Sequence, residues 1–344
     1  MEDKSLDPKN NGNAAGTQKN AGSVNSEEQK EPKAAGEKKK AKIKLPVKSP
    51  HVDYFMPLLH GLDEQGELNE VVKGRVAKAC EIMDDGRNPY DNGFSKNALS
   101  NDIIDSFDSL DAEALEKEAG SRSFALAGRV LSLRSFGKVA FIVLQDEGGR
   151  IQCYIAREDL SEEDYKVFRK IDVGDIVAVT GTLFRTKTDE LTLKCDTFRL
   201  LTKSIRPLPE KYHGLKDQEQ RYRRRYVDLV VNPSTREIFE KRIAIIRHFR
   251  SLMEEAGFYE VETPILQPIP GGATAKPFST HHNALDMQLY MRIAPELYLK
   301  RLLVGGFEKV FEVNRSFRNE GISTRHNPEF TMCEFYWAYA TFED

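Results

Sequence analysis

The sequence has no run of about eighteen or more apolar residues, and its 344 residues include only one tryptophan and four cysteines. A membrane-spanning helix needs about 20 consecutive, mainly apolar residues, so we expect no membrane span. The N-terminus carries Glu2 and Asp3 and lacks an apolar core, unlike a secretory signal or an Arg-rich transit peptide. We therefore expect a cytoplasmic protein.

No two cysteines have the spacing of metal ligands. They are scattered along the chain at Cys80, Cys153, Cys195 and Cys333. In a chain of this length, the pattern indicates free thiols and neither a disulfide framework nor a zinc site. His281 and His282 are adjacent, so on an extended segment they face opposite ways and make a poor metal site.

The chain also lacks a strong net charge. Charged residues make up 31% of the sequence, but the formal net charge is only -3. The overall field of the protein therefore does not favour nucleic-acid binding, and any contact with a polyanion must come from local basic surface. The length allows two domains and a tail.

Residues 1–50 contain almost no large apolar side chains and are predicted to be a disordered, Lys-rich tail. The cluster 38–44 has two open interpretations. It is either a solvated linker, since Glu27, Glu28, Glu31 and Glu37 lie nearby, or a weak, salt-sensitive contact with RNA. Residues 51–120 are predicted to be a helical lead-in, with helices over 68–83 and 108–119.

Short β-prone runs fill the predicted domain 121–205. We expect strands over 124–133, 139–145, 151–156, 176–183 and 191–200. A helix over 159–170 separates the third strand from the fourth, and Asp146-Glu147-Gly148-Gly149 suits a hairpin turn. Five strands with a helix after the third indicate an OB-fold β-barrel, which often binds single-stranded nucleic acid.

Residues 206–232 are predicted to be a linker, marked by Pro207, Pro209 and His213-Gly214. Its segment 221–226 is the densest arginine cluster in the sequence, equally suited to phosphate contacts and to ion pairs between domains. A predicted amphipathic helix over 237–255 and a strand over 258–263 follow, and Pro264 ends the strand.

The segment 309–337 reads as two strands joined by a long polar loop. If the first strand continues, Arg318 and Glu320 share one face, and Glu334 and Tyr336 share a face on the returning strand. The guanidinium, carboxylates and phenol can converge on one pocket or form an ion-paired sheet rim. Spacing alone leaves both open.

Phe317-Arg318-Asn319-Glu320, followed by His326-Asn327-Pro328-Glu329-Phe330, resembles motif 2 of class II aminoacyl-tRNA synthetases, in the variant found in lysyl-tRNA synthetases. The resemblance extends over 68–344. It implies an α+β multidomain protein in which an N-terminal five-stranded OB-fold barrel binds the anticodon, and 233–344 begin an antiparallel-sheet catalytic domain. It also implies ATP-dependent activation of L-lysine and its transfer to tRNA(Lys).

The resemblance assigns roles to individual residues. Arg318 is the expected catalytic residue, which bridges the lysine carboxylate and the α-phosphate of ATP. The expected ATP-binding residues are Arg318, Glu320, Arg325, His326, Asn327 and Phe330. The expected lysine-binding residues are Gly272, Glu296, Arg318, Glu334 and Tyr336. For Glu296 the pattern alone favours a simpler role in the first turn of a helix that begins at Pro295.

On the barrel, the same resemblance assigns Phe141, Gln152 and Glu190 to the central anticodon base. From the pattern alone, Phe141 is expected in the barrel core. Thr188-Asp189-Glu190 departs from the family, in which glycine precedes the glutamate. The helix, strand and proline that end at Pro264 are similar to motif 1, which implies a homodimer with Pro264 at the interface.

The sequence ends at Asp344, after motif 2, and it contains no motif 3. We expect the carboxylates that hold Mg²⁺ with ATP to lie beyond this point, so no metal ligand is assigned here. The expected interpretation is an incomplete lysine–tRNA ligase. The alternatives are a non-catalytic protein that binds tRNA or dimerises, and another class II ligase of the aspartyl or asparaginyl type.

Overall fold

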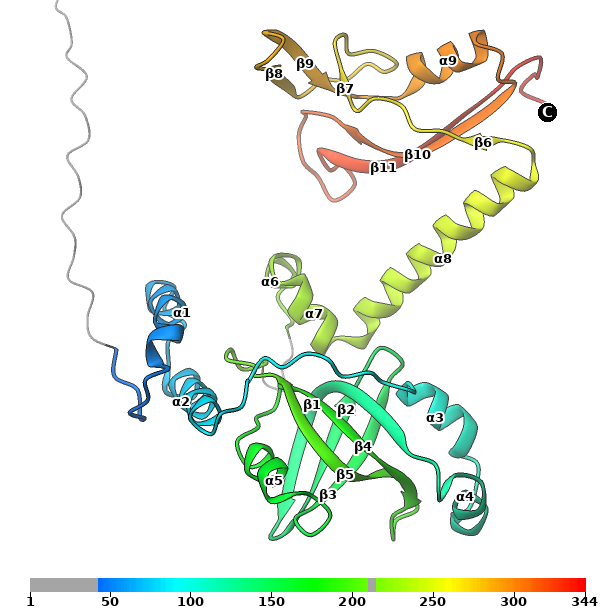
Figure 1. The fold of residues 1–344 in the computed structure, drawn as a ribbon. Helices are drawn as coiled ribbons and strands as arrows, with labels where there is room; N and C mark the ends of the chain where they lie inside the picture. Colours follow the sequence, from blue (N-terminus) through cyan, green and yellow to red (C-terminus); the bar gives the residue numbers. More distant parts are fainter. Residues whose placement is uncertain (1–42, 210–214) are drawn as a thin grey trace, which may run out of the picture.

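A computed structural model describes residues 43–209 and 215–344. Most of the basic cluster 38–44 and the linker residues His213-Gly214 lie outside these ranges. The described chain forms an N-terminal helix pair, a β-barrel, a long connecting helix and a C-terminal pair of small sheets (Figure 1). The α+β, multidomain class predicted from the sequence is confirmed.

The N-terminal pair consists of α1 (Val52–Glu64) and α2 (Glu70–Asp84). Apolar side chains from both helices form a small core, and Ile43, Leu45 and Val47 pack against it. The tail predicted over 1–50 therefore includes too many residues, because these three apolar side chains pack on the helix pair. The helix predicted over 68–83 is confirmed, whereas α1 was not predicted as a separate helix.

The predicted five-stranded barrel is confirmed. Its strands are β1 (Phe124–Phe136), β2 (Val139–Gln145), β3 (Arg150–Ala156), β4 (Ile176–Arg185) and β5 (Leu191–Thr202), closed in the order β1-β2-β3-β5-β4. Buried and less buried residues alternate along β2 and β3, as expected when one face packs inside the barrel. Asp146 donates its N–H to the Gly149 carbonyl at 3.0 Å and closes the β2–β3 turn as expected.

Three helices cover the barrel: α3 (Ser100–Phe107), α4 (Ala112–Ala119) and α5 (Glu162–Phe168). α5 lies between β3 and β4, as predicted. The helix expected over 108–119 is confirmed only for 112–119, because Asp111 adopts an extended conformation and caps α4 by accepting from the Ala114 N–H at 2.8 Å. The preceding turn separates α4 from α3.

A buried ion-pair cluster fixes the helix pair to the barrel. The Lys203 ammonium lies 2.6 Å from carboxylate oxygens of both Asp172 and Asp175, and the side chains of Lys203 and Asp175 are fully buried. Lys78 of α2 reaches the second Asp172 oxygen at 2.7 Å. Burial raises the pKa of Asp172, but the hydrogen bonds from Lys203 and Lys78 outweigh it and hold the pKa below its ordinary value.

The arginine cluster 221–226 is used for ion pairs within the protein. It lies on α6 (Gln218–Arg223) and α7 (Arg225–Val231), where the buried Asp228 carboxylate pairs with Arg221 at 2.8 Å and with Arg225. Arg223 pairs with Glu219 and Arg224 with Glu67. Of the two interpretations left open by the sequence, these contacts favour the structural one.

The long helix α8 (Pro233–Glu255) leads to the C-terminal sheets (Figure 1). One sheet has the order β11-β10-β6, with β6 (Tyr259–Glu260), β10 (Lys309–Phe317) and β11 (Glu329–Trp337). The other has the order β7-β9-β8, with β7 (Leu266–Gln267), β8 (Ser279–His282) and β9 (Met287–Met291). Helix α9 (Glu296–Val304) precedes β10.

The strand expected over 258–263 is shorter than predicted. Only Tyr259 and Glu260 pair with β10, in parallel, because Thr263 turns away to interact with the side chain of Glu312 at 2.6 Å. The predicted amphipathic helix is confirmed by α8, but only its C-terminal half packs on the sheet, where Phe249 and Met253 join Phe311. Phe239 and Ile243, in its N-terminal half, are exposed.

The Lys203 cluster gives a test of what stabilises the end of the barrel to which the helix pair is joined. Lys203→Met should lower the free energy of unfolding by about 3–5 kcal/mol, because the buried Asp175 carboxylate loses its cation. Urea denaturation followed by circular dichroism measures this, since the single tryptophan, Trp337, lies in β11 and not in the barrel.

Lys166→Met is the matched control. Lys166 pairs with Glu162 at 3.5 Å on an exposed helix face, so its loss should cost at most about 0.5 kcal/mol. Similar losses in the two variants would contradict the role given to Lys203.

Candidate active site

The β10–β11 hairpin carries the candidate active site. Its register runs from Lys309 opposite Trp337 to Phe317 opposite Glu329. The ladder ends there, and the Arg318 N–H donates to the Pro328 carbonyl at 2.9 Å across the base of the loop. The strand therefore ends before Glu320, so Arg318 and Glu320 do not share a strand face. Both residues nevertheless line one cavity.

The loop encloses a cavity of about 650 Å³. Its lining residues are Arg318, Glu320, Gly321, Arg325, His326, Asn327, Phe330 and Thr331. All six residues that the sequence analysis assigned to ATP are therefore brought together around one space. The Ser323 hydroxyl, 2.8 Å from His326 Nδ1, helps to fold the loop tip.

Arg318 supplies a free cationic donor to this cavity. Its guanidinium lies 5.1 Å from the centre of the Phe330 ring, and its Nε is buried without a hydrogen-bond partner. No carboxylate forms an ion pair with it among the described residues. A planar guanidinium with unused N–H groups is suited to bind carboxylate or phosphate oxygens.

An acidic pocket adjoins Arg318. The Tyr336 hydroxyl lies 3.3 Å from Glu334 Oε2, and the two side chains share one face of β11. Burial raises the pKa of Glu334, and the negative charges of Glu296 and Glu312 raise it further, against the lowering effects of the Tyr336 hydrogen bond and Arg318. Three carboxylates therefore lie near one another, and a cationic ligand at Glu334 would lessen their mutual repulsion.

The charge of Glu296 also acts on Glu334 and Tyr336. Glu296 begins α9 and pairs with Lys300 at 2.5 Å, so its main interaction is with the next turn of the helix. The Lys300 ammonium also lies 5.9 Å from the centre of the Tyr336 ring. Lys300 thus brings a cation to the pocket, a feature that the sequence analysis missed although the i, i+4 spacing from Glu296 could have indicated it.

Gly272 lies directly against Glu296. A Cβ at this position would come within 2.8 Å of Glu296 Cβ, and the backbone has a φ of +87°, which favours glycine. The absence of a side chain therefore lets the backbone of Gly272 approach the glutamate closely.

A buried ion pair beneath the site was also missed. Arg292 Nη1 lies 2.6 Å from Glu312 Oε1, and the two side chains are 4% and 5% exposed. Arg292 also donates to the Thr263 and Arg315 carbonyls. The signal available in the sequence was Glu312, a charged residue inside the apolar run Val310–Val313.

Among residues 43–209 and 215–344, no group of three or more histidine, cysteine, aspartate or glutamate side chains is arranged to hold a metal ion. His281 instead lies 3.1 Å from the Asp286 carboxylate. The described residues thus offer no built site for the Mg²⁺ expected with ATP. The four cysteines are free, as expected. No helix in the described part of the chain is long and apolar enough to cross a membrane.

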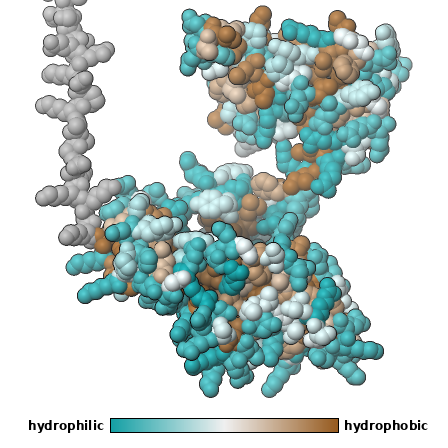
Figure 2. Space-filling model, in the orientation of Figure 1, coloured by the Kyte–Doolittle hydropathy of each residue, from teal (hydrophilic) through white to brown (hydrophobic). Residues whose placement is uncertain are grey.

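Pro264, the predicted interface residue, is exposed, and α8 and the segment after Pro264 also carry exposed apolar residues. These are Ile238, Phe239, Ile243, Ile245, Leu252, Ile265 and Leu266. Hydrophobic surface along α8 is visible in Figure 2.

The barrel presents a separate aromatic face. The Phe141 ring lies 5.3 Å from that of Tyr154, and Phe136 and Phe184 extend the row at 6.4 and 5.7 Å. The core position expected for Phe141 from the pattern alone is wrong, because it occupies a less buried, outward position of β2. Aromatic rings on an open barrel face are suited to stack on bases.

Gln152 and Glu190 lie close to this face. Gln152 Nε2 donates to Thr192 Oγ1 at 3.1 Å, and the Thr192 hydroxyl donates to the Glu190 carbonyl. Asp189, where glycine was expected, has a φ of +61°. The turn therefore keeps the left-handed conformation, which aspartate tolerates better than most residues, and the exposed Glu190 follows it.

Comparison with known proteins decides the family. The family described as "tRNA synthetases class II (D, K and N)" matches residues 217–344, and the family described as "OB-fold nucleic acid binding domain" matches residues 124–201. Over 285 residues, the chain is 54% identical to the lysine–tRNA ligase of Salmonella arizonae. This chain belongs to the class II aminoacyl-tRNA synthetases.

Two further relatives of this class II synthetase are the lysine–tRNA ligases of Methylobacillus flagellatus and Pelotomaculum thermopropionicum, at 55% and 52% identity. The matches cover 81% and 83% of this chain, and 54% and 55% of those relatives. The match to the Salmonella arizonae enzyme covers 83% of this chain and 56% of that enzyme. The chain thus spans about half the length of the curated relatives it matches.

The charge balance of the synthetase pocket can be measured directly. Glu334 should titrate above the ordinary range of a glutamate, and Glu296→Gln should lower its pKa, because the substitution removes a neighbouring negative charge. Carbon-13 NMR of labelled glutamate side chains follows both. Glu308→Gln, which changes an exposed glutamate at the start of the hairpin, should leave the titration unchanged. An unaltered pKa in Glu296→Gln would contradict the electrostatic account.

Proposed function

We propose that this chain provides the lysine-activating site and the anticodon-binding barrel of a lysine–tRNA ligase, which forms lysyl-adenylate from L-lysine and ATP and transfers lysine to tRNA(Lys). The observation that carries the proposal is that Arg318 is common to two groups of residues. It lines the cavity of the candidate ATP residues and contributes to the charge balance of the acidic pocket at Glu334. The similarity to lysine–tRNA ligases supports the choice of substrate.

In the proposed reaction, a lysine carboxylate oxygen forms a bond to the α-phosphorus of ATP. The bond from that phosphorus to the bridging oxygen breaks, and pyrophosphate leaves. Because two anions must approach each other, the site needs cations more than it needs an acid or base. Arg318 would hold a carboxylate and an α-phosphate oxygen together, and Arg325 and His326 would contact the outer phosphates.

The remaining cavity residues would hold the nucleoside. Glu320 and Asn327 would bind the adenine and ribose, and Phe330 would stack on the adenine through the ring face that Arg318 leaves open. Glu320 Oε1 already accepts from the Lys276 N–H at 3.2 Å, which holds the start of the loop in place. Mg²⁺ would neutralise phosphate charge when it is bound with ATP, and none of the steps assigned to these residues depends on it.

Lysine would bind with its α-ammonium at Glu296 and the Gly272 backbone. Its side-chain ammonium would bind at Glu334 and Tyr336. Lys300 already neutralises Glu296 in part, so the substrate must share that carboxylate or displace Lys300. An unpaired buried ammonium is costly, and a buried acidic pocket without its cation is costly too, so neutral analogues should be rejected strongly.

Two other features belong to the proposal. The exposed apolar residues of α8 together with Pro264 support a homodimer, because such a surface is normally covered. The role in translation supports a cytoplasmic location. A non-catalytic tRNA-binding or dimerising protein is less well supported, since it would have no use for the unpaired Arg318. An aspartyl or asparaginyl ligase would not need the acidic pocket.

Lysine-dependent exchange of pyrophosphate into ATP tests the proposal. The chain is assayed when joined to the C-terminal part of the Salmonella arizonae enzyme, because that relative is longer. Glu334→Gln should raise the KM for lysine at least tenfold and change the KM for ATP less than twofold, since it removes only the charge that meets the substrate ammonium. Equal changes in both constants, or exchange that depends on aspartate or asparagine, would contradict the proposal.

The barrel is tested on this chain alone. Phe141→Ala should weaken binding of tRNA(Lys) by about 1–3 kcal/mol through loss of base stacking. Fluorescence anisotropy with labelled tRNA measures the change. Phe136→Ala, at the end of the same aromatic row, should cost less. An unchanged affinity in Phe141→Ala would remove the assignment of Phe141 to the anticodon.

A further inference from the structure

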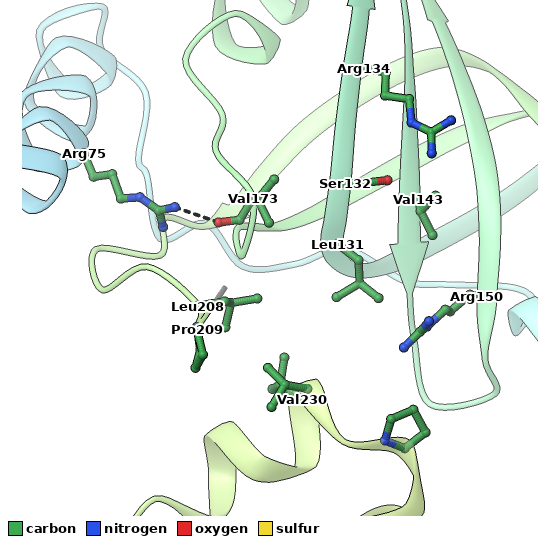
Figure 3. A pocket seen from close by; sticks show the side chains of 12 residues that line it. Arg75, Leu131, Ser132, Arg134, Val143, Arg150, Val173, Leu208, Pro209 and Val230 are labelled. Atoms are coloured by element: carbon green, nitrogen blue, oxygen red, sulfur yellow. Dashed lines mark hydrogen bonds between the residues drawn. The ribbon is translucent and has the colours of Figure 1, made fainter. Parts of the chain in front are cut away.

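A second cavity, of about 700 Å³, lies where the barrel meets the connecting helices. Its wall comes from α2, the barrel strands β1 to β3, the loop before β4, the linker and the junction of α7 and α8 (Figure 3). It shares no lining residue with the cavity of the hairpin loop. Its size falls within the range of small-molecule sites in proteins.

Three arginines and no acidic residue line this cavity: Arg75, Arg134 and Arg150. Arg75 is 8% exposed, donates only to the Val173 and Ser204 carbonyls, and has a buried Nε without a partner. Arg150 contacts the neutral Gln145 side chain at 3.2 Å. Arg134 has no ion pair or side-chain hydrogen bond within the described residues. In Figure 3, Arg75 and Arg150 approach the hollow from opposite sides.

This lack of carboxylates is a local property of the cavity. The neighbouring arginines of the linker and helices are paired with carboxylates, as Arg206 is with Glu67 and Arg221 is with Asp228. Three guanidinium groups around one space without an acid leave a positive charge that an anion would neutralise.

The rest of the wall is mainly apolar. It consists of Leu131, Val143, Val173, Leu208, Pro209, Val230, Val231 and Pro233, together with Ser132. The β-bulge between Val130 and Ser132 explains the position of Leu131, because the extra residue interrupts the inward–outward alternation of β1. A bare inorganic anion would satisfy the arginines but leave these side chains in contact with water.

We propose that this cavity binds a small organic anion with an apolar body, such as an aliphatic or aromatic carboxylate. The anionic group pairs with a guanidinium group of this wall, and the apolar body covers Leu131, Val143 and Val230. Such a ligand contacts the barrel and α7 at once. It therefore stabilises the joint between the two halves of the chain without entering the candidate active site.

The probe pair 8-anilinonaphthalene-1-sulfonate and N-phenyl-1-naphthylamine tests the proposal, since the two dyes share an aromatic body and differ in the sulfonate. Fluorescence titrations are made with the chain and with the double variant Arg134→Gln/Arg150→Gln. Both arginines are exposed, so their replacement should leave no cavity in the protein core. The dissociation constant of the anionic dye should rise at least tenfold, and that of the neutral dye should change less than twofold.

Arg247→Gln, on an exposed turn of α8, is the matched control and should change neither constant. Laurate should displace the anionic dye from the unchanged chain. The proposal is overturned if the double variant binds both dyes as the unchanged chain does, which would place the dye elsewhere, for example on the apolar face of α8. It is also overturned if tRNA displaces the dye and laurate does not, because the arginines would then serve an RNA backbone.

Discussion

The buried ion pair between Arg292 and Glu312 is the interaction on which the arrangement of the candidate active site depends. It joins the end of the β7-β9-β8 sheet to the centre of β10, and Thr263 ties the segment after β6 to the same carboxylate. Loss of one partner from such a pair costs about 3–5 kcal/mol, because the other charge stays buried. The three segments are thereby held in fixed positions relative to one another. This holds β10, the strand that leads into Arg318, in place.

The same pair contributes to the electrostatics of the pocket. Glu312 lies opposite Glu334 in the β10–β11 ladder, and its charge helps to raise the pKa of Glu334. The site therefore combines three carboxylates with three cations, of which Arg292 is engaged by Glu312. Lys300 is engaged by Glu296, whereas Arg318 keeps a donor without a partner. Such a site can take a cationic group at one end and an anionic group at the other, as an amino acid with a basic side chain requires.

The sequence predicted local structure well where periodicity was strong. Strand β2 has the predicted bounds, and the hairpin of β10 and β11 begins and ends at the predicted limits 309 and 337. The motif around Arg318 grouped six residues that all line one cavity. It failed where one side chain decides the outcome. Asp111 caps α4, so the stretch 108–119 is helical only from Ala112. Phe141 faces outward, although aromatic residues more often fill a barrel. The Arg292–Glu312 pair, which joins residues distant in sequence, could not be found from spacing.

The most direct test of the central claim is the affinity of this chain for L-lysine and for L-norleucine, which has a methyl group in place of the ammonium. Isothermal titration measures both under identical conditions. If the carboxylates at Glu296 and Glu334 select the substrate, lysine binds and norleucine binds at least about 100-fold more weakly, because the partly buried Glu334 carboxylate is then left without a cation. Equal affinities, or binding of norleucine alone, would contradict the account.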